Sequence, residues 1–180
     1  MILTTERLLL RHIVDEDAED IYAYCKNPEV GPRAGWAPHD SVENTRELMA
    51  QVFIGQPHVF GMIDDSGKMV GSIGLLPDPH RPGTDVLMLG YALAQECWGR
   101  GYMTEAAKAV VAYGFETAKA SLLTSNTYDF NEASQRVLEH CGFVREGMLH
   151  AGETRYDGKV FDLHMFYLTQ EHFNGLRHLV

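Results

Sequence analysis

The sequence predicts an α/β protein whose mixed, mostly antiparallel central sheet is flanked by helices. Helical and strand periodicities alternate along the chain, in the order strand, two helices, three strands, helix, strand, helix and two strands. Hairpin patterns near both ends favour antiparallel pairing there. The length of 180 residues fits one domain, which we expect over residues 1–180 with a core at about 5–170.

The first part of the chain predicts two helices separated by a loop. Apolar residues recur with helical spacing over Ala18–Cys25 and again over Asp40–Phe53. Between them, Asn27–His39 contains three prolines and two glycines, so we expect an ordered loop there. The caps expected for the two helices are Asp15 for the first, and a capping box of Asp40 and Glu43 for the second.

The rest of the chain alternates strands and helices. A turn signal at Asp65–Gly67 indicates a hairpin, and Pro77–Gly83 cannot continue a strand because proline lacks a backbone donor. The expected strands are His58–Asp64, Lys68–Leu76, Asp85–Leu93, Leu122–Thr127, Phe143–Leu149 and Val160–Thr169. The expected helices are Thr104–Ala118 and Asn131–Cys141, and Gly142 ends the second of them.

The chain is acidic, with a formal net charge of −10. Because binding to nucleic acid needs surplus cations, we expect no nucleic-acid partner, whereas small cationic partners suit this charge. Three cysteines indicate neither a disulfide framework nor a zinc site, and we expect no metal. No stretch reaches the ~18 apolar residues of a membrane span, and the first residues do not resemble a signal peptide. We therefore expect a cytoplasmic protein without a membrane partner.

The most informative segment is Gly90–Ala106, where a strand leads through a glycine-rich loop into a helix. Gly99 and Gly101 allow the backbone to pass close to a ligand and to adopt positive φ. The unpaired N–H groups and the positive dipole end of the following helix favour an anion. The segment therefore predicts a phosphate or pyrophosphate site, although a glycine-rich turn without a ligand remains an alternative.

Three phosphate-binding motifs compete for this loop. A dinucleotide fingerprint lacks its third glycine, because the position holds Thr104. A Walker A string occurs nowhere, which disfavours a nucleotide phosphotransferase. The run Trp98–Met103 resembles motif A of the GCN5-related N-acetyltransferases (GNAT), with Gly101 matched strictly and Trp98 and Met103 departing from the general pattern. Its form Trp-Gly-x-Gly-Tyr is typical of the branch that acetylates ribosomal-protein N-termini, and of its small-molecule relatives.

Two more segments carry the same resemblance. Asn131 and Ser134, followed by Val137–Phe143, are similar to the Asn-x-x-Ser…Gly-Phe segment of the family, and Asn131 is also a suitable helix N-cap. Thr5–Arg11 is similar to the opening strand of the same branch. The resemblance therefore extends over nearly the whole chain. It is specific to the family and leaves the substrate open.

The resemblance implies that an acetyl group passes directly from acetyl-CoA to an amine. The pantetheine arm would insert between two splayed strands, Leu87–Leu93 and Leu122–Thr127, and pair with backbone near Leu93. The pyrophosphate would lie on the N–H groups of Gly99–Thr104, with charge from Arg100. The implied cofactor-binding residues are Leu93, Trp98, Gly99, Arg100, Gly101, Tyr102, Met103, Thr104, Asn131 and Ser134.

The resemblance also implies catalytic roles. In the ribosomal-protein branch the serine of Asn-x-x-Ser acts as acid and a glutamate in the next loop as base, which fall on Ser134 and Glu153 here. The alternatives are a polar residue in a helix turn and a solvated loop carboxylate. Met88 stands where relatives often carry a carboxylate, which shifts the proton transfer to Glu153 or a water chain. Tyr91, Tyr128 and Tyr156 are further donors, each also expected as half-buried core residues.

Trp36 and Tyr91 are the residues that we expect to contact the acceptor, and Trp36 offers a cation–π face for an ammonium. The acceptor itself stays open between a protein N-terminus and a small amine such as a polyamine, an amino acid or an aminoglycoside. A non-catalytic acyl-CoA-binding module is the alternative function, because a binder needs the glycine loop but not Ser134 and Glu153. The oligomeric state, including a homodimer, also stays open.

Overall fold

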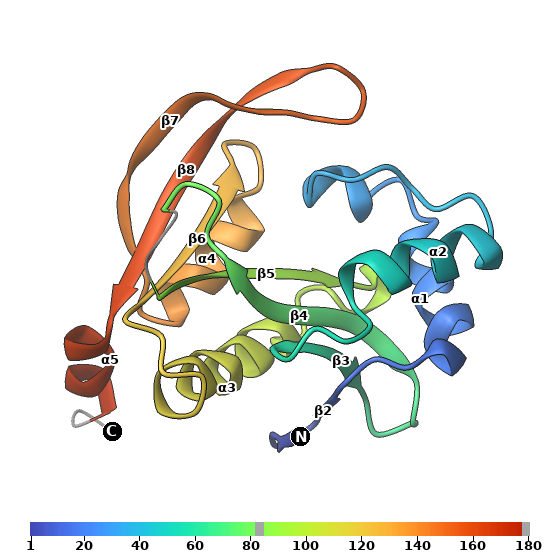
Figure 1. Ribbon diagram of the computed structural model, residues 1–180, viewed down its shortest axis with the longest axis horizontal. Coiled ribbons are helices and arrows are strands. Elements are labelled where there is room, and N and C mark those ends of the chain that lie inside the picture. The colour runs from blue at the N-terminus through green and yellow to red at the C-terminus, as the bar shows by residue number, and fades with distance from the viewer. Residues whose placement is uncertain (82–84, 178–180) are drawn as a thin grey trace. The chain divides into compact units, whose positions relative to one another are not determined.

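The computed structural model describes residues 1–81 and 85–177, which form one sheet of eight strands in the order β1-β2-β3-β4-β5-β6-β8-β7, with helices between them (Figure 1). The β5–β6 pair is parallel and the other described pairs are antiparallel, which confirms the mixed, mostly antiparallel sheet. The strands are β1 Ile2–Thr4, β2 Leu9–Arg11, β3 Val59–Ile63, β4 Met69–Pro77, β5 Val86–Leu93, β6 Leu122–Tyr128, β7 Val144–Thr154 and β8 Val160–Thr169. The helices are α1 Ala18–Cys25, α2 Val42–Val52, α3 Tyr102–Glu116, α4 Glu132–His140 and α5 Gln170–Arg177, with short 3-10 turns η1 Asp15–Asp17, η2 Gly31–Arg33 and η3 Gln95–Cys97.

The chain divides into two compact units. The first unit comprises Met1–Gly74 and Tyr91–Ala109, and the second comprises Leu75–Gly90 and Val110–Val180. Part of the loop predicted at Pro77–Gly83 lies outside the described residues. No helix of the described residues has the length and apolarity needed to cross a bilayer.

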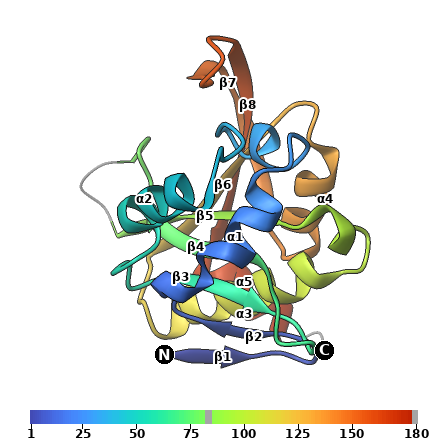
Figure 2. The ribbon, with the colours of Figure 1, turned by 90° about the vertical axis from the view of Figure 1, so that its right-hand side faces the viewer.

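The predicted opening strand, Thr5–Arg11, is wrong in its bounds. Two short strands, β1 and β2, pair antiparallel instead and lie side by side (Figure 2). A turn divides them, because the backbone N–H of Thr5 donates to the carbonyl of Leu8 at 3.0 Å and the backbone N–H of Leu8 donates to the Thr5 hydroxyl at 3.1 Å. A threonine that bonds its own local backbone favours a turn over a continuous strand.

The caps expected for the first two helices, Asp15 and Asp40, are also wrong. Ser41, not Asp40, caps α2, since its side chain accepts from the backbone N–H of Asn44 at 3.0 Å. Asp15 lies in η1, where Asp17 is the buried acid and accepts two hydrogen bonds of 2.7 Å from Arg11. The pairing of Arg11 with Asp17 joins β2 to the start of α1. A helix-capping pattern does not predict it, because Arg11 lies in a strand before the helix.

In the second unit, β7 and β8 form a long two-stranded ribbon (Figure 1). The β6–β8 ladder runs from Leu163 to Thr169, so Val160 and Phe161 at the start of β8 pair with β7 alone. The predicted strand Phe143–Leu149 is therefore too short. Strand β7 continues to Thr154 across an irregularity between Leu149 and Glu153, where Ala151 has φ +50°. Helix α5 was not predicted, and its Phe173 stacks on Phe115 at 5.2 Å between ring centres.

A buried carboxylate, Asp78, stabilises the second unit. Its oxygens accept hydrogen bonds from the Thr124 hydroxyl at 2.7 Å, the backbone N–H of His80 at 2.8 Å and Arg81 at 2.9 Å. Burial alone would raise the pKa of Asp78, but these hydrogen bonds outweigh it and hold the pKa below its ordinary value. The ionised form is therefore favoured by folding, and this contribution is lost as the pH falls through the lowered pKa.

We expect Asp78→Asn to lower the free energy of unfolding by about 1–3 kcal/mol at pH 7, the range for hydrogen bonds to a charged, buried group. Urea unfolding at pH 7 and near pH 3 measures this effect. The difference between the wild type and the variant should shrink at the lower pH, because protonation of the carboxyl is then favoured in the unfolded state and the ionised form contributes less to stability. Equal differences at the two pH values would contradict the role of the ionised carboxylate.

Candidate active site

The predicted site residues lie in both units, and those of the first unit are described first. In the first unit, η3 leads through Trp98 and the two glycines into α3. Gly99 and Gly101 have φ of +71° and +80°, the left-handed region that favours glycine. Helix α3 begins at Tyr102, two residues earlier than the expected Thr104. The glycine loop therefore ends directly in the N-terminal turn of a 15-residue helix, as an anion site requires.

The start of the glycine loop is tied back to the end of β5. The indole N–H of Trp98 donates to the carbonyl of Leu93 at 2.9 Å, and the Arg33 guanidinium lies 5.6 Å from the centre of the Trp98 ring. Trp98 is 38% exposed, whereas Leu93 is buried. A carbonyl has two lone pairs, so the Leu93 oxygen retains capacity for a second donor such as a pantetheine amide.

Cationic groups gather at the beginning of α3. The guanidinium groups of Arg7 and Arg100 lie 4.7 and 4.8 Å from the centre of the Tyr102 ring. Arg100 also donates to the Tyr102 hydroxyl at 3.2 Å. Arg7 is also paired with the Glu105 carboxylate, so the excess positive charge beside the glycine loop comes from Arg100 and favours an anionic ligand there.

The loop that contains Trp36 is ordered, as predicted, and includes η2. The Trp36 ring packs so closely on Gly31 that a Cβ at that glycine would lie 2.6 Å from the ring. The His39 ring contacts the Trp36 ring, with ring centres 5.2 Å apart. Trp36 and Tyr91 are both half-buried in the first unit. Trp36 therefore anchors its loop and keeps part of its ring accessible.

In the second unit, Asn131 caps α4 as predicted. Its side chain accepts from the backbone N–H of Ser134 at 3.3 Å, and Ser134 lies half-buried in the first turn. The described β5–β6 ladder joins Val86–Met88 to Leu122–Thr124, and the Leu89 carbonyl then accepts from the Ser125 hydroxyl at 2.9 Å. The ladder between these two strands is thus short, as expected for a splayed pair.

Glu153 lies on β7 and not in a loop, which corrects its predicted setting. It is opposite Phe161 of β8, and its Oε1 accepts from the Tyr128 hydroxyl at 2.8 Å. Tyr128 stacks on Phe130 and contacts Phe161, with ring centres 5.2 and 4.9 Å apart. The carboxylate therefore stands at the edge of an aromatic cluster and is not simply solvated.

The sequence reasoning named Tyr128 only as a possible donor and as a core residue, and it missed the contact of Tyr128 with Glu153. It is 3% exposed, and burial followed by the neighbouring Glu153 carboxylate raises its pKa well above the ordinary value. Tyr128 thus remains a hydrogen-bond donor that orients Glu153. No local signal reveals this pair, because the two residues are 25 positions apart and meet only through the register of β6, β8 and β7.

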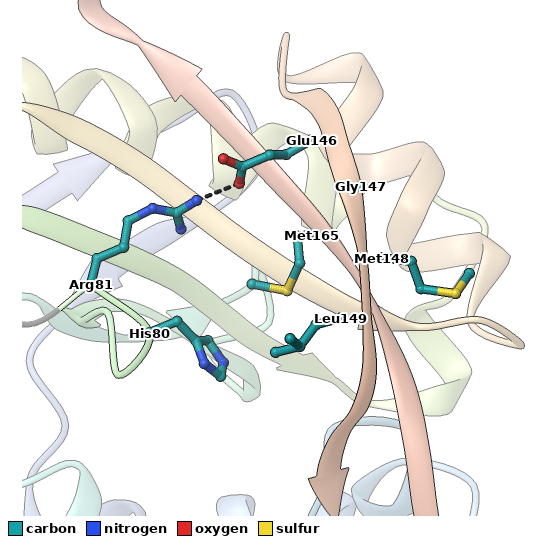
Figure 3. Close-up of a pocket in the computed structure, with 7 residues that line it drawn as sticks. All are labelled: His80, Arg81, Glu146, Gly147, Met148, Leu149 and Met165. Atoms are coloured by element: carbon teal, nitrogen blue, oxygen red, sulfur yellow. Dashed lines mark hydrogen bonds and ion pairs between the residues drawn. The ribbon is translucent and has the colours of Figure 1, made fainter.

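The second unit also contains an open hollow of about 430 Å³ that includes none of the predicted site residues (Figure 3). Arg81 and Glu146 form an ion pair at its rim, and Leu149 and Met165 supply apolar wall. Arg81 pairs with both Asp78 and Glu146, so its charge is already used within the protein. Among the described residues, no group of three His, Cys, Asp or Glu side chains is arranged to hold a metal ion.

Comparison with known proteins adds to this geometry. The acetyltransferase (GNAT) domain family matches residues 7–144. The chain belongs to the GNAT acetyltransferase family. The match begins at Arg7 and includes the glycine loop and Asn131, so the resemblance to this family is confirmed.

Two sequence relatives carry the names of N-acetyltransferases. The uncharacterized N-acetyltransferase YoaA of Bacillus subtilis is 32% identical over 90% of this chain and 96% of its own length. The ribosomal protein uS5-alanine N-acetyltransferase of Escherichia coli is 27% identical, over 81% of this chain and 79% of its own length. This GNAT protein is therefore an N-acetyltransferase enzyme, and not the non-catalytic module of the alternative hypothesis.

Solved structures show the same fold. A GNAT acetyltransferase from Bacillus anthracis has a TM-score of 0.84 and 24% identity, covering 95% of this chain and 99% of that one. Spermidine N-acetyltransferase from Vibrio cholerae, in complex with CoA and spermine, has a TM-score of 0.78 and 20% identity, covering 93% and 98%. At these identities the likeness establishes the GNAT fold alone.

Proposed function

We propose that this N-acetyltransferase moves the acetyl group of acetyl-CoA directly to a primary amine. The observation that carries the proposal is the glycine loop, where two glycines at positive φ lead into the N-terminus of α3 between arginine side chains. Such a loop suits the pyrophosphate of acetyl-CoA, and its cofactor residues are those named from the sequence. Because the family match spans both units, we propose that they act as one domain.

In the proposed reaction Glu153 is the general base. It accepts a proton from the ammonium of the acceptor, so that the neutral amine attacks the thioester carbonyl and the carbon–sulfur bond breaks. Ser134 gives its proton to the departing thiolate, and the remaining excess proton of the attached nitrogen restores the serine hydroxyl. The Tyr128 hydroxyl, at 2.8 Å from Glu153, orients the base. The thioether of Met88, whose sulfur accepts from Asn126 at 3.3 Å, does not take a proton near neutral pH, which leaves the task to Glu153 or to a water chain.

The acceptor is proposed to be a protein N-terminus or a small-molecule amine. A relative that acts on the alanine of ribosomal protein uS5 supports the first class, and the net charge of −10 suits cationic amines of both classes. The test is thiol release from acetyl-CoA with a panel of N-terminal peptides, including alanyl peptides, and of polyamines, amino acids and aminoglycosides. Acetylated product from one class, identified by mass, supports the proposal; acetyl-CoA binding without transfer to any amine contradicts it.

Trp36 is proposed to bind the acceptor ammonium. We expect Trp36→Ala to raise the acceptor KM about 2- to 30-fold, the equivalent of a cation–π contact of about 0.5–2 kcal/mol. The acetyl-CoA affinity should stay within about threefold. Because Trp36 also packs on Gly31, the kinetics are measured per folded molecule alongside a thermal melt. A lower melting temperature with unchanged acceptor kinetics would mean that the tryptophan only anchors its loop.

A further inference from the structure

Arg7 makes an unusual set of contacts for a residue in a turn between two short strands. Its Nη1 donates to the carbonyl of Arg100 at 2.9 Å, and its Nε donates to the carboxylate of Glu105 at 2.7 Å. Its guanidinium carbon also lies 4.7 Å from the centre of the Tyr102 ring. One side chain thus contacts the glycine loop, the first residue of α3 and the acid of the first helical turn.

Glu105 is held equally firmly. Its Oε1 accepts from the Thr5 hydroxyl at 2.6 Å and from the backbone N–H of Arg7 at 2.8 Å. Burial alone would raise the pKa of Glu105, but the hydrogen bonds from Thr5 and Arg7 outweigh it and lower the pKa. An ionised carboxylate in the first turn of α3 would repel an anionic ligand at the same helix end. The Arg7 guanidinium neutralises that charge.

The contact with Arg100 fixes a peptide plane. In a trans peptide the C=O of one residue and the N–H of the next point in opposite directions. Because the Arg100 carbonyl points to Arg7, the N–H of Gly101 points away from Arg7. Gly101 has φ +80°, and a Cβ there would lie 3.4 Å from Arg7 Nη2, so the guanidinium lies directly against the turn.

We propose that Arg7 and Glu105 are positioning residues for the cofactor, acting through the Arg100–Gly101 peptide. Glu105 holds the Arg7 guanidinium, and Arg7 holds the Arg100 carbonyl, so that the Gly101 N–H is presented to the pyrophosphate of acetyl-CoA. This inference rests on the proposed function.

The test compares two acetyl donors, one with and one without the pyrophosphate that the Arg100–Gly101 peptide is proposed to contact. Acetyl-CoA contains the pyrophosphate, whereas S-acetylpantetheine lacks it. For Arg7→Met we expect the dissociation constant of CoA to rise about tenfold, equivalent to about 1.4 kcal/mol. The kcat/KM with S-acetylpantetheine and the kcat with saturating acetyl-CoA should stay within about twofold of wild type. Arg7→Lys should recover only part of the affinity, because a lysine cannot bridge Glu105 and the Arg100 carbonyl as the planar fork does.

Arg46→Met is the matched control. Arg46 is a similarly exposed arginine of the first unit that pairs with Asp15, so the variant changes the net charge by the same amount without touching the loop. Its CoA affinity should match the wild type. A tenfold loss in this control as well would attribute the effect to net charge and overturn the inference.

The remaining outcomes are distinguishable. If the wild type binds CoA and folded Arg7→Met and Glu105→Gln bind it equally well, the positioning role is wrong while the proposed function stands. If the variants lose activity with both donors in proportion, Arg7 has a general structural role and the inference is likewise overturned. If the wild type binds no CoA, the proposed function fails and the inference fails with it. Should Arg7→Met not fold, Arg7→Lys and Glu105→Gln give the same comparison.

Discussion

Replacing Glu153 by glutamine is expected to lower kcat/KM for the acceptor by about 10²- to 10⁴-fold, the range for loss of a general base. Glutamine preserves the size of the side chain, and its amide oxygen still accepts from the Tyr128 hydroxyl that lies 2.8 Å from the carboxylate. What is lost is the ability to take a proton from the ammonium. The dissociation constant of acetyl-CoA should not change, because Glu153 belongs to the proposed acceptor chemistry.

Steady-state kinetics across pH, with acetyl-CoA affinity measured by calorimetry, check this expectation. A rate that depends on a general base changes with pH, and the variant should lose that dependence. Glu146→Gln is the matched control, because Glu146 lies on the same strand and pairs with Arg81 instead. Near-normal activity and an unaltered pH profile in Glu153→Gln would leave the carboxylate without a catalytic role.

Two related variants separate orienting from proton transfer. Tyr128→Phe removes the hydroxyl that holds Glu153 while keeping the ring among Phe130 and Phe161. Its kcat/KM should fall less than that of Glu153→Gln, because the base itself remains. Ser134→Ala should also slow turnover less, since water can replace a hydroxyl proton donor on the thiolate.

The parts of the fold that the sequence predicts well are those set by local chemistry. The glycine loop, the Asn131 cap of α4 and the hairpin turn at Asp65–Gly67 each depend on residues within a few positions of one another. The extension of β7 to Thr154 escaped prediction because its burial pattern is almost uniformly exposed and an irregularity interrupts it. Without alternation of apolar and polar residues, a strand leaves no period in the sequence.

The candidate site divides in the same way. The motif residues are visible because a glycine at positive φ or a helix cap has few substitutes. Arg7 and Glu105 are 98 positions apart, and the sequence contains nothing that relates them. Tyr128 is aromatic and buried, which is the ordinary property of a core residue. Only the register of the strands shows that the Tyr128 hydroxyl contacts the Glu153 carboxylate. Residues that orient a catalytic group are therefore harder to predict from the sequence than the motif residues.

Replacing Gly101 by valine is expected to weaken acetyl-CoA binding by about 5- to 150-fold, equivalent to about 1–3 kcal/mol. Gly101 has φ +80°, a region that a β-branched residue adopts only with strain of that size. The new Cβ would lie 3.4 Å from Arg7 Nη2, and the valine methyl groups beyond it would displace the guanidinium. If the backbone strain or the clash with Arg7 is relieved, the Arg100–Gly101 peptide rotates. The Gly101 N–H, which we expect to contact the pyrophosphate, then changes direction.

Gly55→Val is the control that isolates the effect on the loop. Gly55 has φ +79° and nothing within 4 Å of its Cβ position, so valine there imposes comparable backbone strain away from the glycine loop. Both variants should lower the melting temperature, but only Gly101→Val should weaken acetyl-CoA binding in calorimetry. A folded Gly101→Val protein with wild-type affinity would show that the loop does not hold the pyrophosphate. Valine at position 101 must strain or move the turn, so unchanged affinity would mean that the cofactor binds through other residues.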